Sequence, residues 1–313
     1  MRYNTYIKEA PKVSEIGLGA WQLGVNSGWR SMSEQEAIAM VHTALDLGIN
    51  FIDTAPNYGN GTSELRLGKA LKGIDRSKVV INTKFGHTAE GDLNFSAGHV
   101  RESVEGSLRR MQIDYVDSVI IHNPPDKYLD GRKNDHYEIL EHLIDEGKIR
   151  AYGASLDTYE QMKLFMETTN CEVIEAFFNM LFQDTARAFG LARKKNVGII
   201  AKIPLDSGWL TGKYKADSTF DDIRSRWSQE DIRTRAGLVD QVKQIIGDNY
   251  VLSQAAIAFC LSYDAVSTVI PGNTTIEQLK SNVESVKKPL PYALVKELEQ
   301  FYKDEVRPRQ LPW

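Results

Sequence analysis

The sequence has few of the features that mark secreted, zinc-binding or membrane proteins. It contains only two cysteines, Cys171 and Cys260, which lie far apart and outside any C-x-x-C pattern. Structural disulfides and cysteine-ligated zinc are therefore not expected, and a reducing cytoplasm suits the chain best. No stretch approaches the roughly 18 consecutive apolar residues that cross a membrane, and the N-terminal MRYNTYIKEAPKV lacks the apolar segment of a signal peptide. We expect a cytoplasmic protein with no membrane partner and no metal.

The chain also lacks an excess of charge of either sign. A formal net charge of -4 over 313 residues gives no overall positive field, so nucleic acid is not an expected partner. Hydrophobic residues make up 42% of the chain and charged residues 26%. These fractions are ordinary for globular proteins, so the composition predicts a globular fold. The length allows a large core, no low-complexity linker divides the sequence, and the oligomeric state stays open.

Short apolar runs rich in β-branched residues alternate with longer segments of helical periodicity. The eight runs are centred near residues 16, 52, 81, 119, 152, 176, 200 and 269. After the first run, SEQEAIAMVHTALDLG begins with a capping box of Ser33 and Glu36 and ends at Gly48. The segments SAGHVRESVEGSLRRM and DTARAFGLARKKN are also predicted helices. The pattern therefore predicts eight strand–helix units.

Eight such units without a linker favour the α/β class, as a single (β/α)8 TIM barrel domain over residues 1–313. A doubly wound open sheet is the alternative. It would need G-x-G-x-x-G after its first strand, and GLGAWQLG has a different spacing. In a barrel of this kind the active site lies at the C-terminal face of the strands.

One long segment after the seventh strand, about residues 205–230, has no clear periodicity. A loop of this length in a compact domain is usually functional or disordered. The basic stretch at its end contains Arg224, Arg226, Trp227, Arg233 and Arg235. We interpret this stretch as a solvated, charge-balanced helical surface, with a lid or an anion clamp as the alternative.

Four polar side chains of different chemistry follow three consecutive predicted strands. The second strand ends at Asp53, with Tyr58 just beyond it, and Lys84 and His122 stand at the ends of the next two strands. Each residue alone has an ordinary structural explanation, as a turn cap, a solvated strand end or a loop hydrogen bond. Because the C-terminal ends of parallel barrel strands meet at one rim, we expect all four to converge there.

The four side chains together suit protonation of an oxygen that becomes an alkoxide. Tyrosine has an unperturbed pKa of about 10, which is too high for easy proton donation and return near neutrality. A Lys84 ammonium beside Tyr58 is expected to lower that pKa, and Asp53 is expected to keep the lysine charged. His122 would orient a substrate carbonyl. The set contains no metal-ligand cluster and no serine or cysteine nucleophile, so hydride from a nicotinamide is the expected source of electrons.

With these residues in place, the chain resembles the aldo-keto reductases over nearly its whole length, most closely their bacterial branch similar to aryl-alcohol dehydrogenases. The stretches that carry the resemblance are GLGAWQLG, ALDLGINFIDTAPNYGNGTSE, TKFG, IIHNPP, GKIRAYGAS, IPLDSGWLTGKY and VIPGNTTIEQLKSN. The resemblance implies the barrel fold, reduction of a small-molecule carbonyl substrate, and a catalytic tetrad of Asp53, Tyr58, Lys84 and His122. It also implies NADPH, with NADH possible, bound extended across the C-terminal face without a Rossmann unit.

The same resemblance assigns cofactor contacts. They are Ala20, Trp21, Asp53, Ser155, Glu175, Lys202, Leu205, Ser207, Leu210, Lys213, Gly272, Asn273, Thr274, Gln278 and Asn282. Four positions depart from the family pattern: Leu156 replaces an asparagine, Glu175 a glutamine, Lys202 a stacking tyrosine, and Thr274 a frequent arginine or lysine. Because Thr274 carries no positive charge toward a 2'-phosphate, we expect only a modest preference for NADPH.

Two of these departures stand on neighbouring predicted strands. An unpaired charge in an enclosed site is costly, so we predict a salt bridge between Glu175 and Lys202. The alternative is that Lys202 reaches solvent or a cofactor phosphate while Glu175 meets a backbone donor. Two other functions stay open: a Schiff-base aldolase using Lys84 or Lys202, and a cofactor-binding redox sensor with little turnover. The candidate walls of an aromatic substrate pocket are Trp21, Trp29 and Tyr58, with a place in the barrel core as the alternative for Trp21.

Overall fold

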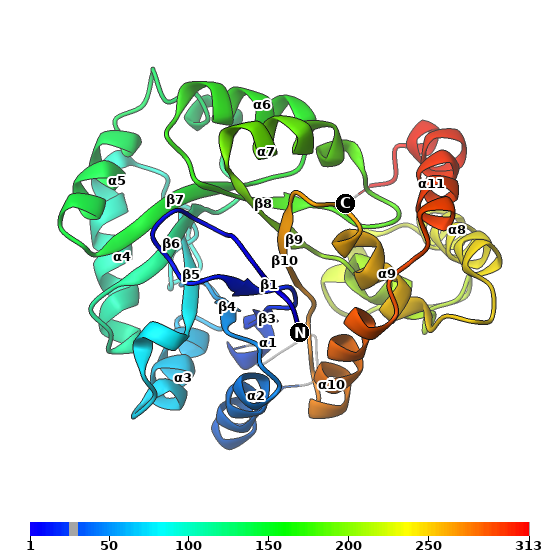
Figure 1. The fold of residues 1–313 in the computed structure, drawn as a ribbon, viewed down its shortest axis with the longest axis horizontal. Helices are drawn as coiled ribbons and strands as arrows, with labels where there is room; N and C mark the ends of the chain where they lie inside the picture. The colour runs from blue at the N-terminus through cyan, green and yellow to red at the C-terminus, as the bar shows by residue number, and fades with distance from the viewer. Residues whose placement is uncertain (25–30, 313) are drawn as a thin grey trace.

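The computed structural model describes residues 1–24 and 31–312. Its main sheet has eight parallel strands in the order β10-β9-β8-β7-β6-β5-β4-β3. The strands are β3 (Leu18–Gly19), β4 (Phe51–Asp53), β5 (Val80–Phe85), β6 (Val116–Ile121), β7 (Ile149–Leu156), β8 (Val173–Phe177), β9 (Gly198–Lys202) and β10 (Val266–Ile270). Bridges from Ile16 to Val269 and from Gly19 to Gly272 join the first and last strands and close the sheet. The predicted (β/α)8 barrel is confirmed (Figure 1).

Helices surround the barrel strands (Figure 1). Their bounds are α1 (Trp21–Gly24), α2 (Glu34–Asp46), α3 (Thr62–Leu71), α4 (Ala97–Met111), α5 (His136–Asp145), α6 (Tyr159–Thr168), α7 (Phe189–Lys195), α8 (Gln229–Ile246), α9 (Leu252–Leu261), α10 (Ile276–Glu284) and α11 (Tyr292–Phe301). The predicted capping box is present, because the Glu36 N–H donates to Ser33 Oγ and the Ser33 N–H to the Glu36 carboxylate. Gly48 follows α2 with φ 84°, a conformation that favours glycine.

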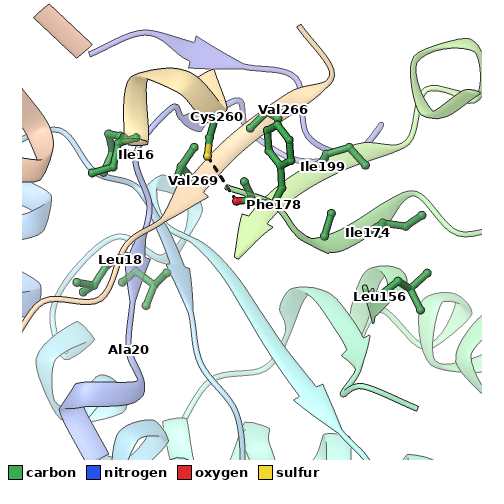
Figure 2. Close-up of a cluster of buried hydrophobic side chains, with 14 of the residues drawn as sticks. Ile16, Leu18, Ala20, Leu156, Ile174, Phe178, Ile199, Cys260, Val266 and Val269 are labelled. Carbon is green, nitrogen blue, oxygen red and sulfur yellow. Dashed lines mark hydrogen bonds between the residues drawn. The ribbon is translucent and has the colours of Figure 1, made fainter. Parts of the chain in front are cut away.

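The strand residues alternate between two apolar layers. Outward-facing residues such as Ile174 and Ile199 pack in the large cluster between sheet and helices, and Figure 2 shows part of this layer with Phe178 and Cys260. Inward-facing residues at the strand starts, among them Phe51, Val80 and Ile200, form a second cluster inside the barrel. Because inward positions recur every second residue, the residues two and four places further along each strand face the barrel axis near its C-terminal end.

An N-terminal hairpin closes the other end of the barrel. β1 (Tyr3–Asn4) pairs antiparallel with β2 (Val13–Ser14). Tyr6, between the two strands, packs edge-on against Phe51 with ring centroids 5.2 Å apart, inside the inward cluster. This hairpin, visible in dark blue in Figure 1, was not predicted from the sequence. It leaves the C-terminal face as the open end.

The segment after β9 contains two short 3-10 helices, η4 (Asp206–Thr211) and η5 (Ile223–Arg226), before α8 begins. The interpretation of its basic stretch as a solvated surface is wrong for two of the four arginines. Arg235 is fully buried and pairs with buried Asp206 at 2.7 Å, and buried Arg224 pairs with Asp222. Aspartates of the same segment compensate these charges, which the local pattern alone did not indicate.

Within residues 1–24 and 31–312, no helix is long and apolar enough to span a bilayer. The same residues contain no cluster of three or more histidine, cysteine, aspartate or glutamate side chains arranged to hold a metal ion.

Candidate active site

Strand register brings three of the four predicted residues to one rim. Asp53 of β4 lies beside Asn82 of β5, and Lys84 of β5 lies beside Ile120 of β6. Val80 belongs to the inward cluster, so Lys84, four residues later on the same strand, also faces inward. His122 follows β6 directly, and its main-chain N–H continues the ladder to the Phe85 carbonyl at 2.9 Å.

A tight turn after β4 delivers Tyr58 to the same place. The Tyr58 N–H donates to the Ala55 carbonyl at 3.2 Å. Gly59 follows with φ 62°, and a Cβ atom there would stand 1.8 Å from the carbonyl oxygen of Gly24. The glycine pair therefore allows α1 to pack against the turn, and any larger residue at 59 would push Tyr58 out of position.

Lys84 is the centre of the polar cluster. Its buried Nζ donates to both carboxylate oxygens of Asp53 at 2.7 Å, to the Thr54 carbonyl at 3.1 Å and to the Tyr58 hydroxyl at 3.2 Å. Glu175 Oε2 lies 3.4 Å from the same ammonium. The sequence predicts that Lys84 lies beside both Asp53 and Tyr58. Both contacts are present in the structure.

The protonation states follow from burial and from these charges. Burial lowers the pKa of Lys84, but Asp53, Glu175 and Tyr58 outweigh it and hold the pKa well above its usual value. Burial raises the pKa of Asp53 to about 7, despite the opposing pull of Lys84. The expectation that Lys84 lowers the pKa of Tyr58 is wrong as a net effect. Burial raises that pKa above its usual value, and the carboxylates of Asp53 and Glu175 add to the rise.

His122 is a neutral imidazole at the rim. Burial lowers its pKa well below the usual value, and the charges of Lys84, His87 and Lys202 lower it further. Its ring meets that of Tyr58 edge-on, with centroids 6.0 Å apart. The His122 ring also stacks on the ring of His87, with centroids 4.3 Å apart and planes 26° apart. A neutral imidazole offers one N–H donor and one acceptor, which suits orientation of a substrate oxygen.

Three further residues support the cluster and were missed from the sequence. Asn82 donates to Asp53 Oδ1 at 2.6 Å, Ser118 donates to Asn82 Oδ1 at 2.5 Å, and the Tyr6 and Ser118 hydroxyls lie 2.6 Å apart. These bonds connect the N-terminal hairpin to the rim. The signal was present for Asn82, because it stands two residues before Lys84 and therefore on the same strand face.

The predicted Glu175–Lys202 salt bridge is wrong. Lys202 Nζ lies 2.8 Å from Asp157 Oδ1, and it donates to Asn123 Oδ1 at 2.7 Å and to Ser155 Oγ at 2.8 Å. The register explains the difference. Glu175 lies beside Ile200, whereas Lys202 lies beside Phe177, so the two charges occupy successive levels of the barrel. Neither the predicted pair nor its alternative describes the observed partners.

The residues assigned to the nicotinamide end lie around this cluster. Ser155 of β7 lies beside Glu175 of β8 in the register, and its hydroxyl donates to Glu175 Oε1 at 3.5 Å. Ala20 donates its N–H to the Asp53 carbonyl at 2.8 Å, and Trp21 is half-buried at the start of α1. The side chain of Leu156 packs in the outer apolar layer, as Figure 2 shows. It therefore points to the opposite face of β7 from the side chain of Ser155. Trp29 lies outside the described residues.

The segment that follows β9, which the family resemblance assigns to the cofactor pyrophosphate, has an unusual backbone. Ile203, Asp206, Ser207 and Gly208 all have positive φ, which is rare for a β-branched residue such as Ile203 and marks a strained connection. Leu205 and Ser207 are half-buried and Lys213 is exposed. Leu210 is fully buried in the core, so its side chain cannot contact a ligand at the rim and only its main chain remains available.

The segment that the family resemblance assigns to the adenosine end of the cofactor follows β10 and opens α10. Gln278 Oε1 accepts from the Thr274 N–H at 2.8 Å and from its hydroxyl at 2.9 Å, while Asn282 donates to Asn273 Oδ1 at 2.7 Å. A Cβ atom at Gly272 would stand 2.6 Å from the Gln22 amide nitrogen. Gln22 Oε1 is buried without a hydrogen-bond partner.

These features fit a dinucleotide at this face. An accessible glycine backbone, a buried orphan amide oxygen, neutral side-chain donors and a helix N-terminus are together typical of a nucleotide site. Gln22 was not assigned from the sequence, although it stands in the quoted GLGAWQLG stretch.

The barrel and the cluster at its C-terminal rim define an NAD(P)-dependent oxidoreductase. The chain belongs to the aldo/keto reductase family, whose profile matches residues 15–303. It is 31% identical over 282 residues to L-galactose dehydrogenase of Arabidopsis thaliana, with 88% of this chain and 85% of that protein covered. It is 29% identical over 294 residues to an NADH-specific methylglyoxal reductase of Escherichia coli K12, covering 88% and 90%. The holo form of an aldo-keto reductase from Bacillus halodurans has a TM-score of 0.79 at 26% identity, with 96% of each chain covered. The bacterial relatives support the predicted branch.

Proposed function

We propose that the protein reduces an aldehyde or ketone to the alcohol, with Tyr58 as the general acid. The observation that carries the proposal is the 3.2 Å contact between Lys84 Nζ and the Tyr58 hydroxyl, with the ammonium held by Asp53. The raised pKa of Tyr58 keeps its phenol protonated until a substrate oxygen gains negative charge. The Lys84 ammonium then stabilises the phenolate that is left behind. His122, as a neutral N–H donor, orients the carbonyl.

A bound nicotinamide supplies the hydride. We propose that the ring end of the cofactor meets Ser155, Glu175 and Lys202, and that the pyrophosphate meets the main chain after β9. The adenosine end would meet the segment that opens α10. NADPH is the proposed preference, with NADH accepted, because Gln278 keeps its amide N–H donors for a 2'-phosphate but Thr274 adds no positive charge there. We propose that this preference is modest, and a relative named as NADH-specific is consistent with use of NADH.

The charges argue against the aldolase alternative. A Schiff-base lysine must be a neutral amine when it attacks. Lys84 is held as an ammonium between Asp53 and Glu175, with a raised pKa, and Lys202 has three close acceptors. Neither lysine is prepared for nucleophilic attack.

Cofactor oxidation, followed at 340 nm with NADPH and with NADH against aromatic, aliphatic and sugar carbonyls, tests the proposal. We expect turnover of at least one carbonyl class. Tight cofactor binding without turnover of any of them would favour a redox sensor, and borohydride trapping of a substrate on a lysine would favour an aldolase. The dissociation constants of NADPH and NADH, each measured at two salt concentrations, test the cofactor preference. A steep salt dependence of NADPH binding would reveal a cation near the 2'-phosphate.

A further inference from the structure

Within residues 1–24 and 31–312, the only ion-pair partner of Glu175 is Lys84, which it shares with Asp53. The Glu175 carboxylate is buried, and its Oε2 atom lacks a hydrogen-bond partner and lies 3.4 Å from Lys84 Nζ. That ammonium already donates twice to Asp53 at 2.7 Å. The other oxygen, Oε1, accepts only a long 3.5 Å bond from Ser155. Two buried carboxylates therefore share one buried ammonium.

The neighbouring lysine does not correct this imbalance. Lys202 lies 2.8 Å from Asp157 Oδ1, so its charge is matched by that carboxylate. Asp53, Asp157 and Glu175 together carry one negative charge more than Lys84 and Lys202. Asp157 is the most exposed of the three acids, with 40% of its side chain accessible, so the excess charge lies at the buried end, on Asp53 and Glu175. Burial raises the pKa of Asp53 to about 7, and the Glu175 carboxylate adds to that rise.

A buried, poorly compensated carboxylate is costly unless it meets a cation. Glutamine, which the resemblance places at this position, would keep the shape and the hydrogen bonding without that cost. The ring proposed to lie beside Ser155 and Glu175 is neutral in the reduced cofactor and carries a positive charge in the oxidised cofactor. A negative charge at Glu175 distinguishes these two states, whereas a glutamine does not.

We propose that Glu175 selects the oxidised, cationic nicotinamide over the reduced, neutral one. This inference rests on the proposed function, because it needs a nicotinamide beside β7 and β8. Tighter binding of the product form makes the bound reduced cofactor a stronger hydride donor to a carbonyl. It also slows release of the oxidised cofactor.

The test is binding without substrate, measured by calorimetry for the oxidised and the reduced form of the same cofactor. The wild type should bind the oxidised form at least as tightly as the reduced form. Glu175→Gln should weaken the oxidised form by about tenfold and leave the reduced form within about twofold, a change of about 30 mV in the potential of the bound two-electron couple. Glu175→Asp, which keeps the charge, should hold the ratio close to the wild-type value.

Glu64→Gln is the matched control. Glu64 is a buried carboxylate of α3 that binds Thr83 Oγ1 and Arg110 Nε, both at 2.6 Å, outside the Lys84 cluster. Its loss should not change the affinity ratio. Equal effects of Glu175→Gln on both forms, or a wild-type preference for the reduced form, would overturn the inference while leaving the proposed function intact. Failure of the wild type to bind either form would instead remove the proposed function.

Discussion

Replacing Lys84 by methionine removes the ammonium that holds the polar cluster together. The lysine is fully buried and makes two 2.7 Å bonds to Asp53, with Glu175 at 3.4 Å. Its removal leaves two enclosed carboxylates without a cation. Loss of one partner of a buried pair typically costs about 3–5 kcal/mol, and we expect a decrease of that size in the free energy of unfolding at about pH 8.

The loss should depend on pH in a defined direction. The pKa of Asp53 is raised to about 7 in the folded protein, so the folded state holds a proton that the unfolded chain releases at lower pH. Such a group contributes stability below its unfolded pKa and loses it as the pH rises through the folded pKa. Without Lys84 the folded pKa rises further. The difference between Lys84→Met and wild type should therefore be smaller near pH 5, where Asp53 is protonated in both, than near pH 8.

Urea unfolding followed by far-UV circular dichroism at these two pH values measures the effect. Lys69→Met is the control, because Lys69 pairs with Glu34 at 2.7 Å but both side chains are about half exposed. It should cost no more than about 1 kcal/mol at either pH. The double variant with Asp53→Asn should regain part of the loss at about pH 8. A small, pH-independent effect of Lys84→Met would refute the reasoning.

Other predictions concern the phenol and the second buried pair. Because burial holds the pKa of Tyr58 above its usual value, kcat for reduction should not lose its proton donor between about pH 7 and about pH 9; a decline centred near pH 8 would indicate the lowered pKa that the sequence suggested. Arg235→Met should lower the free energy of unfolding by about 3–5 kcal/mol, because fully buried Asp206 loses its 2.7 Å partner. Adding Asp206→Asn should recover part of that loss in the same denaturation assay, and a wild-type value for Arg235→Met alone would contradict the buried pair.

The barrel was predictable because its signals are local and repeated. Strand-length apolar runs alternate with capped helices, and the capping box at Ser33 and Glu36 is a pattern of nearby residues. The convergence of Asp53, Lys84 and His122 followed from chain order alone, since successive parallel strands in a barrel are neighbours. The β1–β2 hairpin has strands of only two residues each, too short for a periodicity to appear.

The predictions that were wrong depended on strand register or on how deeply a side chain is buried, and neither can be read from the sequence. Glu175 and Lys202 stand on adjacent strands, but a register difference of two residues gives them different partners. The pKa of Tyr58 depends on a balance between burial, one ammonium and two carboxylates, and the sequence shows the charges without their distances. The burial of Arg235 depends on Asp206, which is 29 residues away in the chain.

The most direct test of the account is the turnover of Tyr58→Phe with saturating reduced cofactor and the best carbonyl found for the wild type. We expect kcat to fall by roughly 10²–10⁴-fold, because the variant keeps the ring but loses the proton donor, while the dissociation constant of the cofactor stays within about twofold. Tyr152→Phe, which removes a phenol that donates to Glu141 at 2.9 Å away from the cluster, should keep wild-type turnover. Wild-type turnover in Tyr58→Phe would contradict the claim that Tyr58 protonates the substrate.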